Sequence, residues 1–283
     1  MRTNPQKAAA AFLRWAGSKR QLLPTITQHL PSEADRYIEP FAGSACLFFS
    51  LAPKKAILAD VNAELMATYR AVQRFPEDVA AQLKGLRRSK REYLRMRSLE
   101  PSRMSPSQRA ARFIYLNRFC FNGLYRTNRM GQFNVPYGAS GTGKLPNARL
   151  LKACSKALRR VTLLTGDFEA TLQRARPGDF VYMDPPYATA AKRVFNEYHS
   201  RGFSAEDVAR VRRGMERLAR KRVNFLVSYA ESPEARLLRK GFDYARVRVR
   251  RNIAGFTRRR KYSNEILIWN HWDSYAHKTK TPG

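Results

Sequence analysis

Cysteine is scarce in this chain, and its few copies lie far apart. The 283 residues include three cysteines, Cys46, Cys120 and Cys154. An odd number without paired spacing argues against a disulfide framework and against a structural zinc site. The four histidines show no metal-ligand spacing either. We therefore expect no bound metal, and we expect the cysteines to behave as small buried hydrophobic residues.

Long hydrophobic runs are also missing. Near the N-terminus, Arg2 and Lys7 precede only a short alanine run, which is too short for the core of a signal peptide or for a membrane span. We therefore expect a cytosolic protein without a membrane partner. Hydrophobic residues still make up 43% of the chain, which is enough for one or two folded domains.

Acidic residues are few relative to basic ones. The chain has 54 Lys and Arg against 22 Asp and Glu, a formal net charge of +32. Such a charge favours a polyanionic partner, and nucleic acid is the first candidate. Ribosomal and membrane-surface proteins are basic too, so the charge alone does not identify the polyanion.

Short apolar runs that end in polar or small residues predict strands, with helical patterns between them. The predicted strands are residues 37–38, 56–59, 161–164, 180–183 and 223–227. Helices are expected at residues 46–51 and 205–220. This alternation predicts an α/β protein with a mostly parallel sheet covered on both faces. Strand patterns at residues 245–250 and 265–269 predict a late hairpin at one sheet edge.

The middle of the chain differs from its two ends. Residues 63–75 and 107–119 have helical patterns, and the aromatic and β-branched residues between Asn122 and Gly138 predict a β-hairpin or long loop. Residues 138–143 are expected to be flexible. The predicted organisation is a discontinuous α/β domain of residues 1–62 and 161–272, an inserted, mainly helical domain of residues 63–160 with a hairpin, and a polar tail of residues 273–283.

Asp184-Pro185-Pro186-Tyr187 directly follows the predicted strand at residues 180–183. Open α/β sheets bind ligands at such strand ends. Asp184 offers an acceptor for an amino group, the two prolines stiffen the backbone, and Tyr187 offers a flat surface for a planar base. The structural alternative is a Pro-Pro turn that Asp184 caps and against which Tyr187 packs.

A second candidate site lies at the first two strands. Residues 39–45, Glu39-Pro40-Phe41-Ala42-Gly43-Ser44-Ala45, connect the first strand to a helix, and Gly43 would let the backbone approach a ligand. Asp60 ends the next strand, where a carboxylate suits a ribose diol, although Asp60 could instead cap a helix. Phosphate binding would call for more glycines and a helix N-terminus free of acid. The pattern therefore favours a nucleoside over a dinucleotide.

Five segments with these features occur in a fixed order. They are Phe12-Leu13-Arg14-Trp15-Ala16-Gly17-Ser18-Lys19, residues 39–45, Ala59-Asp60-Val61-Asn62, residues 115–126 and the quartet at residues 184–187. In these segments the chain closely resembles the Dam-type DNA adenine-N6 methyltransferases of the D12 class, over roughly residues 12–269. The resemblance implies a Rossmann-like, S-adenosylmethionine-dependent methyltransferase sheet. Residues 1–62 and 161–272 would form the catalytic domain and residues 63–160 the target-recognition domain.

The resemblance also implies S-adenosylmethionine as the cofactor. The cofactor-binding residues that it implies are Trp15, Lys19, Glu39, Phe41, Gly43, Asp60 and Asp184. Lys19 suits the cofactor's carboxylate, whereas acidic side chains suit its ribose diol and its ammonium group. Trp15 offers an apolar wall, and a core position for it is not excluded. Ala45 stands where the family often has a second glycine, and alanine can keep a similar turn.

Duplex DNA is the partner that the resemblance implies. The DNA-binding residues that it implies are Asn122, Leu124, Arg126, Pro136 and Arg259. Arg126 suits a guanine edge, Leu124 can wedge a base step, and Asn122 can fill the gap left by a flipped base. A packed turn residue is the alternative for Leu124, and a phosphate contact is the alternative for Arg126. Arg259 lies in a basic segment typical of a backbone clamp.

The implied reaction is direct, in-line methylation of N6 of an adenine flipped out of a GATC site, in bacterial or phage-derived cytosol. The catalytic residues are Asp184, Pro185, Pro186 and Tyr187, with Asp184 and the Pro185 carbonyl accepting the two N6 hydrogens. The alternatives are a cytosine-N4 methyltransferase, a methyltransferase for RNA or a protein amide, and a basic DNA-binding protein with an inactive core. We expect a monomer, and the sequence leaves open whether it pairs with a restriction endonuclease.

Overall fold

The structure is a computed structural model. It describes residues 8–128, 130–138, 143–188, 203–251 and 261–270. The predicted polar tail and Arg259 lie outside these residues, as do residues 139–142 of the predicted flexible stretch.

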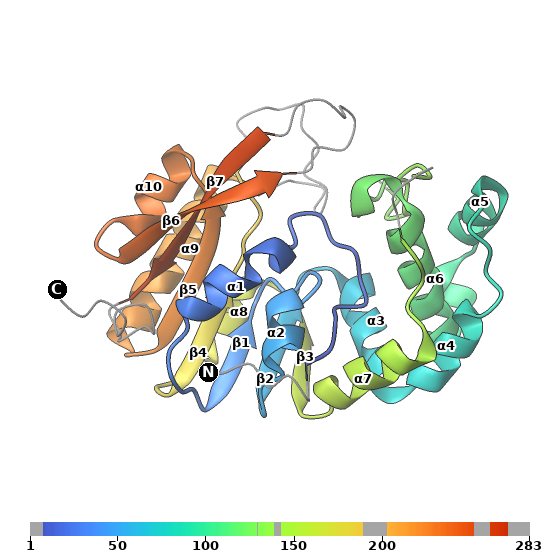
Figure 1. Ribbon diagram of the computed structural model, residues 1–283, viewed down its shortest axis with the longest axis horizontal. Coiled ribbons are helices and arrows are strands. Elements are labelled where there is room, and N and C mark those ends of the chain that lie inside the picture. Colours follow the sequence, from blue (N-terminus) through green and yellow to red (C-terminus); the bar gives the residue numbers. More distant parts are fainter. Residues whose placement is uncertain (1–7, 129, 139–142, 189–202, 252–260, 271–283) are drawn as a thin grey trace.

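Within these residues, seven strands form one mixed sheet (Figure 1). They are β1 (Arg36–Glu39), β2 (Ala56–Asp60), β3 (Val161–Thr165), β4 (Asp179–Met183), β5 (Asn224–Ala230), β6 (Asp243–Arg251) and β7 (Lys261–Trp269). Their order across the sheet is β3-β2-β1-β4-β5-β7-β6. Strands β1 to β5 pair in parallel, whereas β7 lies antiparallel between β5 and β6. The parallel sheet and the late hairpin at its edge are both as predicted.

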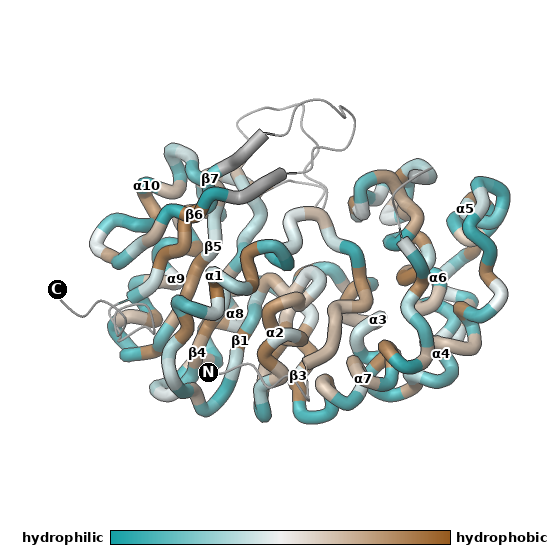
Figure 2. Tube along the Cα trace, in the orientation of Figure 1, coloured by the Kyte–Doolittle hydropathy of each residue, from teal (hydrophilic) through white to brown (hydrophobic). Residues whose placement is uncertain are grey.

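Helices cover both faces of this sheet, as expected for buried parallel strands. One face packs against α1 (Leu23–Gln28) and α2 (Cys46–Leu51), and the other packs against α8 (Phe168–Gln173), α9 (Ala205–Arg220) and α10 (Pro233–Arg239). Successive side chains of each strand point to opposite faces of the sheet. In β4, for example, Phe180 belongs to the first hydrophobic cluster and Val181 to the second. Figure 2 shows the hydrophobic residues gathered along the central strands and α2.

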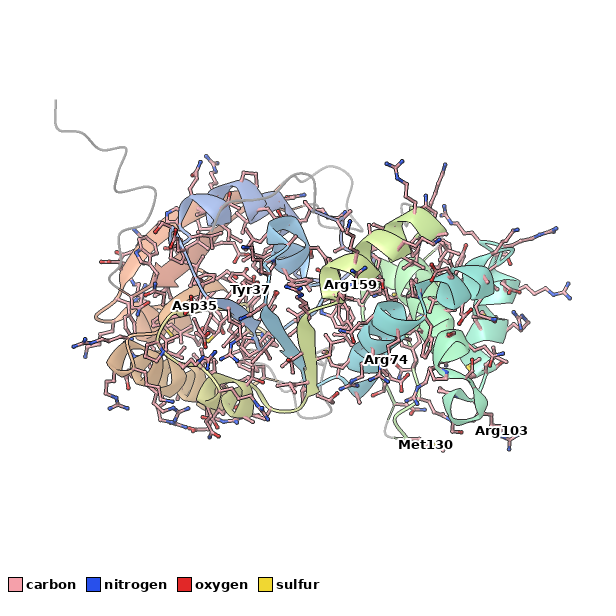
Figure 3. The ribbon with its side chains drawn as sticks, turned by 90° about the horizontal axis from the view of Figure 1, so that it is seen from below. Asp35, Tyr37, Arg74, Arg103, Met130 and Arg159 are labelled. Atoms are coloured by element: carbon pink, nitrogen blue, oxygen red, sulfur yellow. The ribbon has the colours of Figure 1, made fainter. Side chains whose placement is uncertain are left out.

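Five α-helices of the described residues lie between β2 and β3 in sequence and gather beside the β3 edge of the sheet (Figure 1). They are α3 (Ala63–Arg74), α4 (Pro76–Leu83), α5 (Lys90–Ser98), α6 (Pro106–Phe119) and α7 (Ala148–Leu158). Helix α3 contacts both β3 and α6, and one hydrophobic cluster runs from the sheet into these helices. A division into two domains at residues 63 and 160 therefore stays a prediction. Figure 3 labels Asp35 and Tyr37 in the sheet part, and Arg74, Arg103, Met130 and Arg159 in the helical part.

The segment after α6 doubles back on itself as an irregular hairpin. Its two arms pair antiparallel at two isolated bridges, Cys120 with Tyr137 and Thr127 with Phe133. Pro136 has no N–H to donate, and a 3₁₀ turn at Phe121–Gly123 follows α6 directly, so a continuous ladder cannot form here. The predicted hairpin is thus present as a loop-like pair of arms rather than as two regular strands.

None of the helices in the described ranges is both long enough and apolar enough to cross a bilayer. All three cysteines are buried and free, as the sequence predicts.

Candidate active site

Three carboxylates meet at the carboxyl ends of three neighbouring strands. Glu39 ends β1, Asp60 ends β2, and Asp184 directly follows β4. Strand β1 lies between β2 and β4, so the chain reverses its direction of travel across the sheet at this point. Such a switch point leaves a crevice in which open α/β sheets bind ligands.

A cavity of about 630 Å³ occupies this crevice. Every cofactor-binding and catalytic residue that the sequence singles out lines it, although these residues come from four separate parts of the chain. The sequence reasoning therefore identified one continuous site, not several unrelated motifs. The roles of the individual residues within it remain predictions.

The turn after β1 brings backbone close to the cavity. Gly43 has a positive φ of 46°, and a Cβ at this position would lie 2.9 Å from Cδ1 of Trp15. Only glycine fits under the indole ring in this conformation. Ala45, where the family often has glycine, also has a positive φ of 48° and is buried, so alanine keeps the turn at a cost in backbone strain.

Asp60 holds this turn in place. Its Oδ2 accepts a hydrogen bond from the backbone N–H of Gly43 at 3.0 Å, and its Oδ1 accepts one from the N–H of Asn62 at 2.9 Å. The N-cap of α3 is Asn62, whose Oδ1 accepts from the N–H of Leu65. The alternative reading of Asp60 as the helix cap is therefore wrong, and its carboxylate stays at the cavity wall.

Glu39 is a buried carboxylate, and its side-chain hydrogen-bond partner among the described residues is Tyr37. The hydroxyl of Tyr37 donates to its Oε2 at 2.8 Å, and the side chain is only 3% exposed. Burial raises the pKa of Glu39 well above its usual range, while the hydrogen bond from Tyr37 opposes that rise. A cationic ligand group beside Glu39 would lower its pKa and favour the ionised carboxylate.

Asp184 is held on one oxygen. Lys19 Nζ lies 2.7 Å from its Oδ1, and the hydroxyl of Ser228 donates to the same oxygen at 2.9 Å. Among the described residues, none donates a hydrogen bond to Oδ2. Burial raises the pKa of Asp184, and the ammonium of Lys19 opposes that shift. One oxygen is thus fixed by the protein, and the other is left to accept an amino group.

Lys19 is directed at the catalytic quartet. Besides Asp184, its ammonium donates to the carbonyl of Gly17 at 3.0 Å and to the hydroxyl of Tyr187 at 3.2 Å. An ammonium has three hydrogens, so these contacts use all of them. Burial alone would lower the pKa of Lys19, but Asp184, Tyr187 and Glu265 together outweigh this effect and raise it. The geometry therefore favours a role at Asp184 over the expected contact with the cofactor's carboxylate.

An aromatic wall also lines the cavity, and of its residues only Phe41 is marked by the sequence motifs. Phe41 packs against Phe168 at 5.0 Å and against Phe203 at 6.2 Å between ring centroids. The guanidinium of Arg210 lies 4.7 Å from the centre of the Phe168 ring and pairs with Asp167 at 2.7 Å. Asp167 and Phe168 follow β3, so the strand-end rule could have found them. Phe203 lies just before α9 and Arg210 lies within it, and no local pattern marks either residue.

Four of the five implied DNA-binding residues lie on the irregular hairpin and do not line the cavity, whereas Arg259 lies outside the described residues. Arg126 donates from Nε to Oδ1 of Asn134 at 2.8 Å, across the two arms. Leu124 packs partly buried against the hydrophobic core, whereas Pro136 is exposed. Asn122 has a positive φ of 56° in the 3₁₀ turn. The packing of Leu124 agrees with its structural alternative, and the free chain alone does not test its contact with DNA.

Trp15 connects the hairpin to the cavity. Its indole stacks on Tyr125 of the hairpin at 6.2 Å and on Phe113 of α6 at 6.4 Å, and it also lies against the Gly43 turn. Trp15 is therefore both a packed aromatic residue and part of the cavity wall, so the two readings of the sequence hold together.

The arrangement suits a nucleoside joined to a charged chain. The aromatic wall of Phe41, Phe168 and Phe203 can cover a planar base, Asp60 can accept from a diol, and Glu39 can receive an ammonium group. The free oxygen of Asp184 adds an acceptor for a second, incoming amine. These features fit S-adenosylmethionine beside an amino group that is to be methylated.

Comparison with known proteins agrees with this chemistry. Residues 15–253 match the model of the D12 class N6 adenine-specific DNA methyltransferase family. The chain is 38% identical over 269 residues to the type II methyltransferase M1.LlaDCHI of Lactococcus lactis subsp. cremoris, covering 92% of this chain and 95% of the relative. It is 32% identical over 269 residues to the DNA adenine methylase of Escherichia coli strain K12, again covering 92% and 95%.

Among solved structures, the chain is similar to the delta-N METTL16 methyltransferase domain. The TM-score is 0.40 at 11% sequence identity, over 90% of this chain and 80% of the other.

Proposed function

This chain belongs to the D12 class N6 adenine-specific DNA methyltransferase family, and we propose that it methylates N6 of an adenine flipped out of a GATC site. It is an adenine-specific DNA methyltransferase that depends on S-adenosylmethionine, with a Rossmann-like methyltransferase sheet. The observation that carries the proposal is the unequal hydrogen bonding of the two Asp184 carboxylate oxygens. Lys19 and Ser228 hold its Oδ1, and no described residue donates to its Oδ2.

We assign the cofactor to the 630 Å³ cavity. Phe41 and Phe168 would cover its base, Asp60 its ribose diol and Glu39 its ammonium group. S-adenosylmethionine, when bound, supplies a methyl group already activated by its sulfonium. No covalent enzyme intermediate is then required, which agrees with the burial of all three cysteines.

The catalytic work of the protein is positioning. Asp184 Oδ2 would accept one hydrogen of the adenine amino group, and the Pro185 carbonyl the other. This turns the nitrogen lone pair away from the ring and toward the methyl group. Tyr187 lines the same cavity and would stack on the base. The amine nitrogen would carry a positive charge once it bonds to the methyl group, with S-adenosylhomocysteine as the leaving group. The Asp184 carboxylate would stabilise this charge until the nitrogen loses a proton to it or to water.

The hairpin would read the DNA. The adenine amino group cannot be reached inside a stacked duplex, so the base must leave the helix. Arg126 would contact a guanine of the site, Leu124 and Asn122 would occupy the space at the flipped base, and Pro136 would add a further contact. The Trp15 stack, which joins the hairpin to the Gly43 turn, supports a recognition element close to the reaction centre. Arg259 lies outside the described residues and is kept as a proposed phosphate clamp.

Methylated DNA provides the direct test. Duplex DNA that carries GATC sites is incubated with the protein and S-adenosylmethionine, digested, and examined by mass spectrometry. N6-methyladenine is expected, and N4-methylcytosine would replace the proposal with the cytosine alternative. Sequencing of the modified DNA then decides the site, because methylation spread over many adenines would exclude GATC specificity. The same experiment with RNA tests that substrate class.

Arg126→Ala is expected to relax discrimination at the guanine next to the target adenine. A bidentate contact between arginine and guanine contributes about 1–3 kcal/mol of discrimination. We therefore expect the ratio of rates on GATC and on sites altered at that guanine to fall about 10- to 100-fold. Steady-state rates on matched oligonucleotides measure this ratio.

The exposed Arg91 of α5 supplies the control for Arg126. Arg91→Ala removes the same charge away from the hairpin, so it should weaken binding to all sequences alike and leave the ratio unchanged. Equal behaviour of the two variants would remove Arg126 from base recognition.

Cofactor affinity is expected to fall as pH falls, because Glu39 must be ionised to hold an ammonium group. Burial raises the pKa of Glu39 in the free protein, so a bound ammonium group lowers that pKa and drives a proton off the protein. Calorimetry at neutral pH and at successively lower pH, in buffers with different ionisation enthalpies, should show proton release on binding.

Glu39→Gln should abolish this proton release and weaken cofactor binding about 10- to 100-fold, because a charge-assisted hydrogen bond is lost. Proton release that persists in Glu39→Gln would assign it to another group.

Oligomeric state and pairing with a restriction endonuclease are further predictions. We propose a monomer that acts on cellular DNA. The Lactococcus lactis relative is named a type II methyltransferase, and the pairing of this chain with an endonuclease stays a prediction.

A further inference from the structure

Glu265 is a carboxylate that neither the sequence motifs nor the proposed function uses. It lies on β7 with 4% of its surface exposed. Strand β7 runs antiparallel to β5, and Glu265 pairs with Ala230, the last residue of β5. The early part of β7 therefore lies at the same sheet edge as the carboxyl ends of the parallel strands, where the cavity is.

At this edge Glu265 contacts the catalytic quartet. The hydroxyl of Tyr187 donates to Oε1 of Glu265 at 2.8 Å. The same hydroxyl accepts from Lys19 Nζ at 3.2 Å. The phenol thus stands between a carboxylate and an ammonium, which sets the direction of its hydrogen and of its lone pair.

Tyr187 is also held along its ring. Tyr229 of β5 packs edge-on against it, at 5.2 Å between ring centroids and 80° between ring planes. The hydroxyl of Tyr229 in turn accepts from the backbone N–H of Ala188 at 2.9 Å. The Tyr187 side chain is therefore constrained at its hydroxyl, through Glu265, and at its ring, through Tyr229.

A buried carboxylate is costly unless a nearby group compensates for its lost hydration. Here the compensating groups belong to the reaction site itself. The negative charge of Glu265 also contributes to raising the pKa of Lys19, so Glu265 helps keep cationic the ammonium that binds Asp184.

We propose that Glu265 is a positioning residue for methyl transfer. Its hydrogen bond would fix the phenol of Tyr187 beside Lys19 and Asp184, so that a base stacked on Tyr187 places its amino group at Asp184. The inference rests on the proposed function, because it gives Tyr187 the role of contacting the base. The proposal adds β7 to the elements that position the reacting groups.

A matched pair of substitutions tests the proposal. Glu265→Gln keeps an oxygen that can accept from Tyr187, whereas Glu265→Met has a similar length and no such acceptor. Single-turnover methylation of a GATC duplex is measured at saturating S-adenosylmethionine. We expect Glu265→Met to slow it about 10- to 100-fold, because small displacements of reacting groups have effects of this size, and Glu265→Gln to restore most of the rate. The cofactor dissociation constant should stay unchanged in both.

Tyr187→Phe tests the same hydrogen bond from its other end. It should slow the reaction to a similar extent, and Glu265→Met should add little in the Tyr187→Phe background, because the bond is already gone. This comparison keeps the test valid even if Glu265→Met folds poorly. Glu231→Gln is the control, since Glu231 lies beyond β5 and binds Arg246 and Asn264 instead.

Three outcomes would overturn the proposal: a wild-type rate in Glu265→Met, an equal loss in Glu265→Gln and Glu265→Met, or full additivity with Tyr187→Phe. If instead the proposed function were wrong, the wild-type protein itself would form no N6-methyladenine, so the two failures can be distinguished.

Discussion

Asp184→Ala is expected to slow methyl transfer about 10³-fold while duplex DNA binding stays nearly unchanged. The physical reason is the asymmetric environment of the carboxylate. Lys19 and Ser228 occupy Oδ1, so Oδ2 is the oxygen placed for the adenine amine. Removing the side chain removes both the acceptor that orients the lone pair and the charge that stabilises the nascent cation. DNA affinity arises from basic residues elsewhere and should persist.

Transfer of labelled methyl groups under single-turnover conditions measures the first quantity, and fluorescence anisotropy of a labelled duplex measures the second. Asp78→Ala, on the exposed surface of α4, serves as a control for the loss of a carboxylate and should match the wild type. Near-normal turnover of Asp184→Ala would exclude Asp184 from the chemistry.

The same assignment predicts a pH dependence. The acceptor works as a carboxylate, so the rate should fall as pH falls through the pKa of Asp184. Burial raises that pKa, and Lys19 limits the rise. Asp184→Asn should flatten this limb of the profile, since the amide does not titrate. A profile that keeps its acidic limb in Asp184→Asn would belong to another group, such as Glu39.

Asp60→Ala is expected to weaken S-adenosylmethionine binding about 100-fold or more, because it removes hydrogen bonds to a diol and support for the turn at once. Asp60 accepts from the backbone of Gly43, and Gly43 carries the cavity wall under Trp15. Calorimetry without DNA gives the dissociation constant directly. Asp60→Asn should also weaken binding, because its amide NH₂ would face one of the two backbone N–H groups.

Asn62→Ala separates the ligand effect from helix stability. It removes the N-cap of α3 and should lower the free energy of unfolding by about 1 kcal/mol, with little change in cofactor affinity. An Asp60→Ala variant that binds the cofactor as tightly as the wild type would contradict the assignment of the ribose to Asp60.

Much of the fold could be predicted because its signals are local. Helices α2 and α9 have the predicted bounds, and the five parallel strands lie within a few residues of the predicted ones. The hydrophobic pattern of a helix or strand depends on which of its side chains are buried, so it can be recognised within that segment alone. The irregular pairing of the hairpin was less predictable, because it depends on how residues 120–127 and 133–138 pack against α6.

The sequence by itself determined the chemical types at this site and their approximate place. Side chains at the carboxyl ends of parallel strands gather at one sheet edge, and the resemblance to the methyltransferase family places Glu39, Asp60 and Asp184 at one cofactor pocket. Tertiary structure alone decided which groups pair across the cavity. Lys19 and Asp184 are 165 positions apart, and Tyr187 and Glu265 are 78 apart. No local pattern encodes such contacts, because they depend on the order of strands in the sheet and on the antiparallel return of β7.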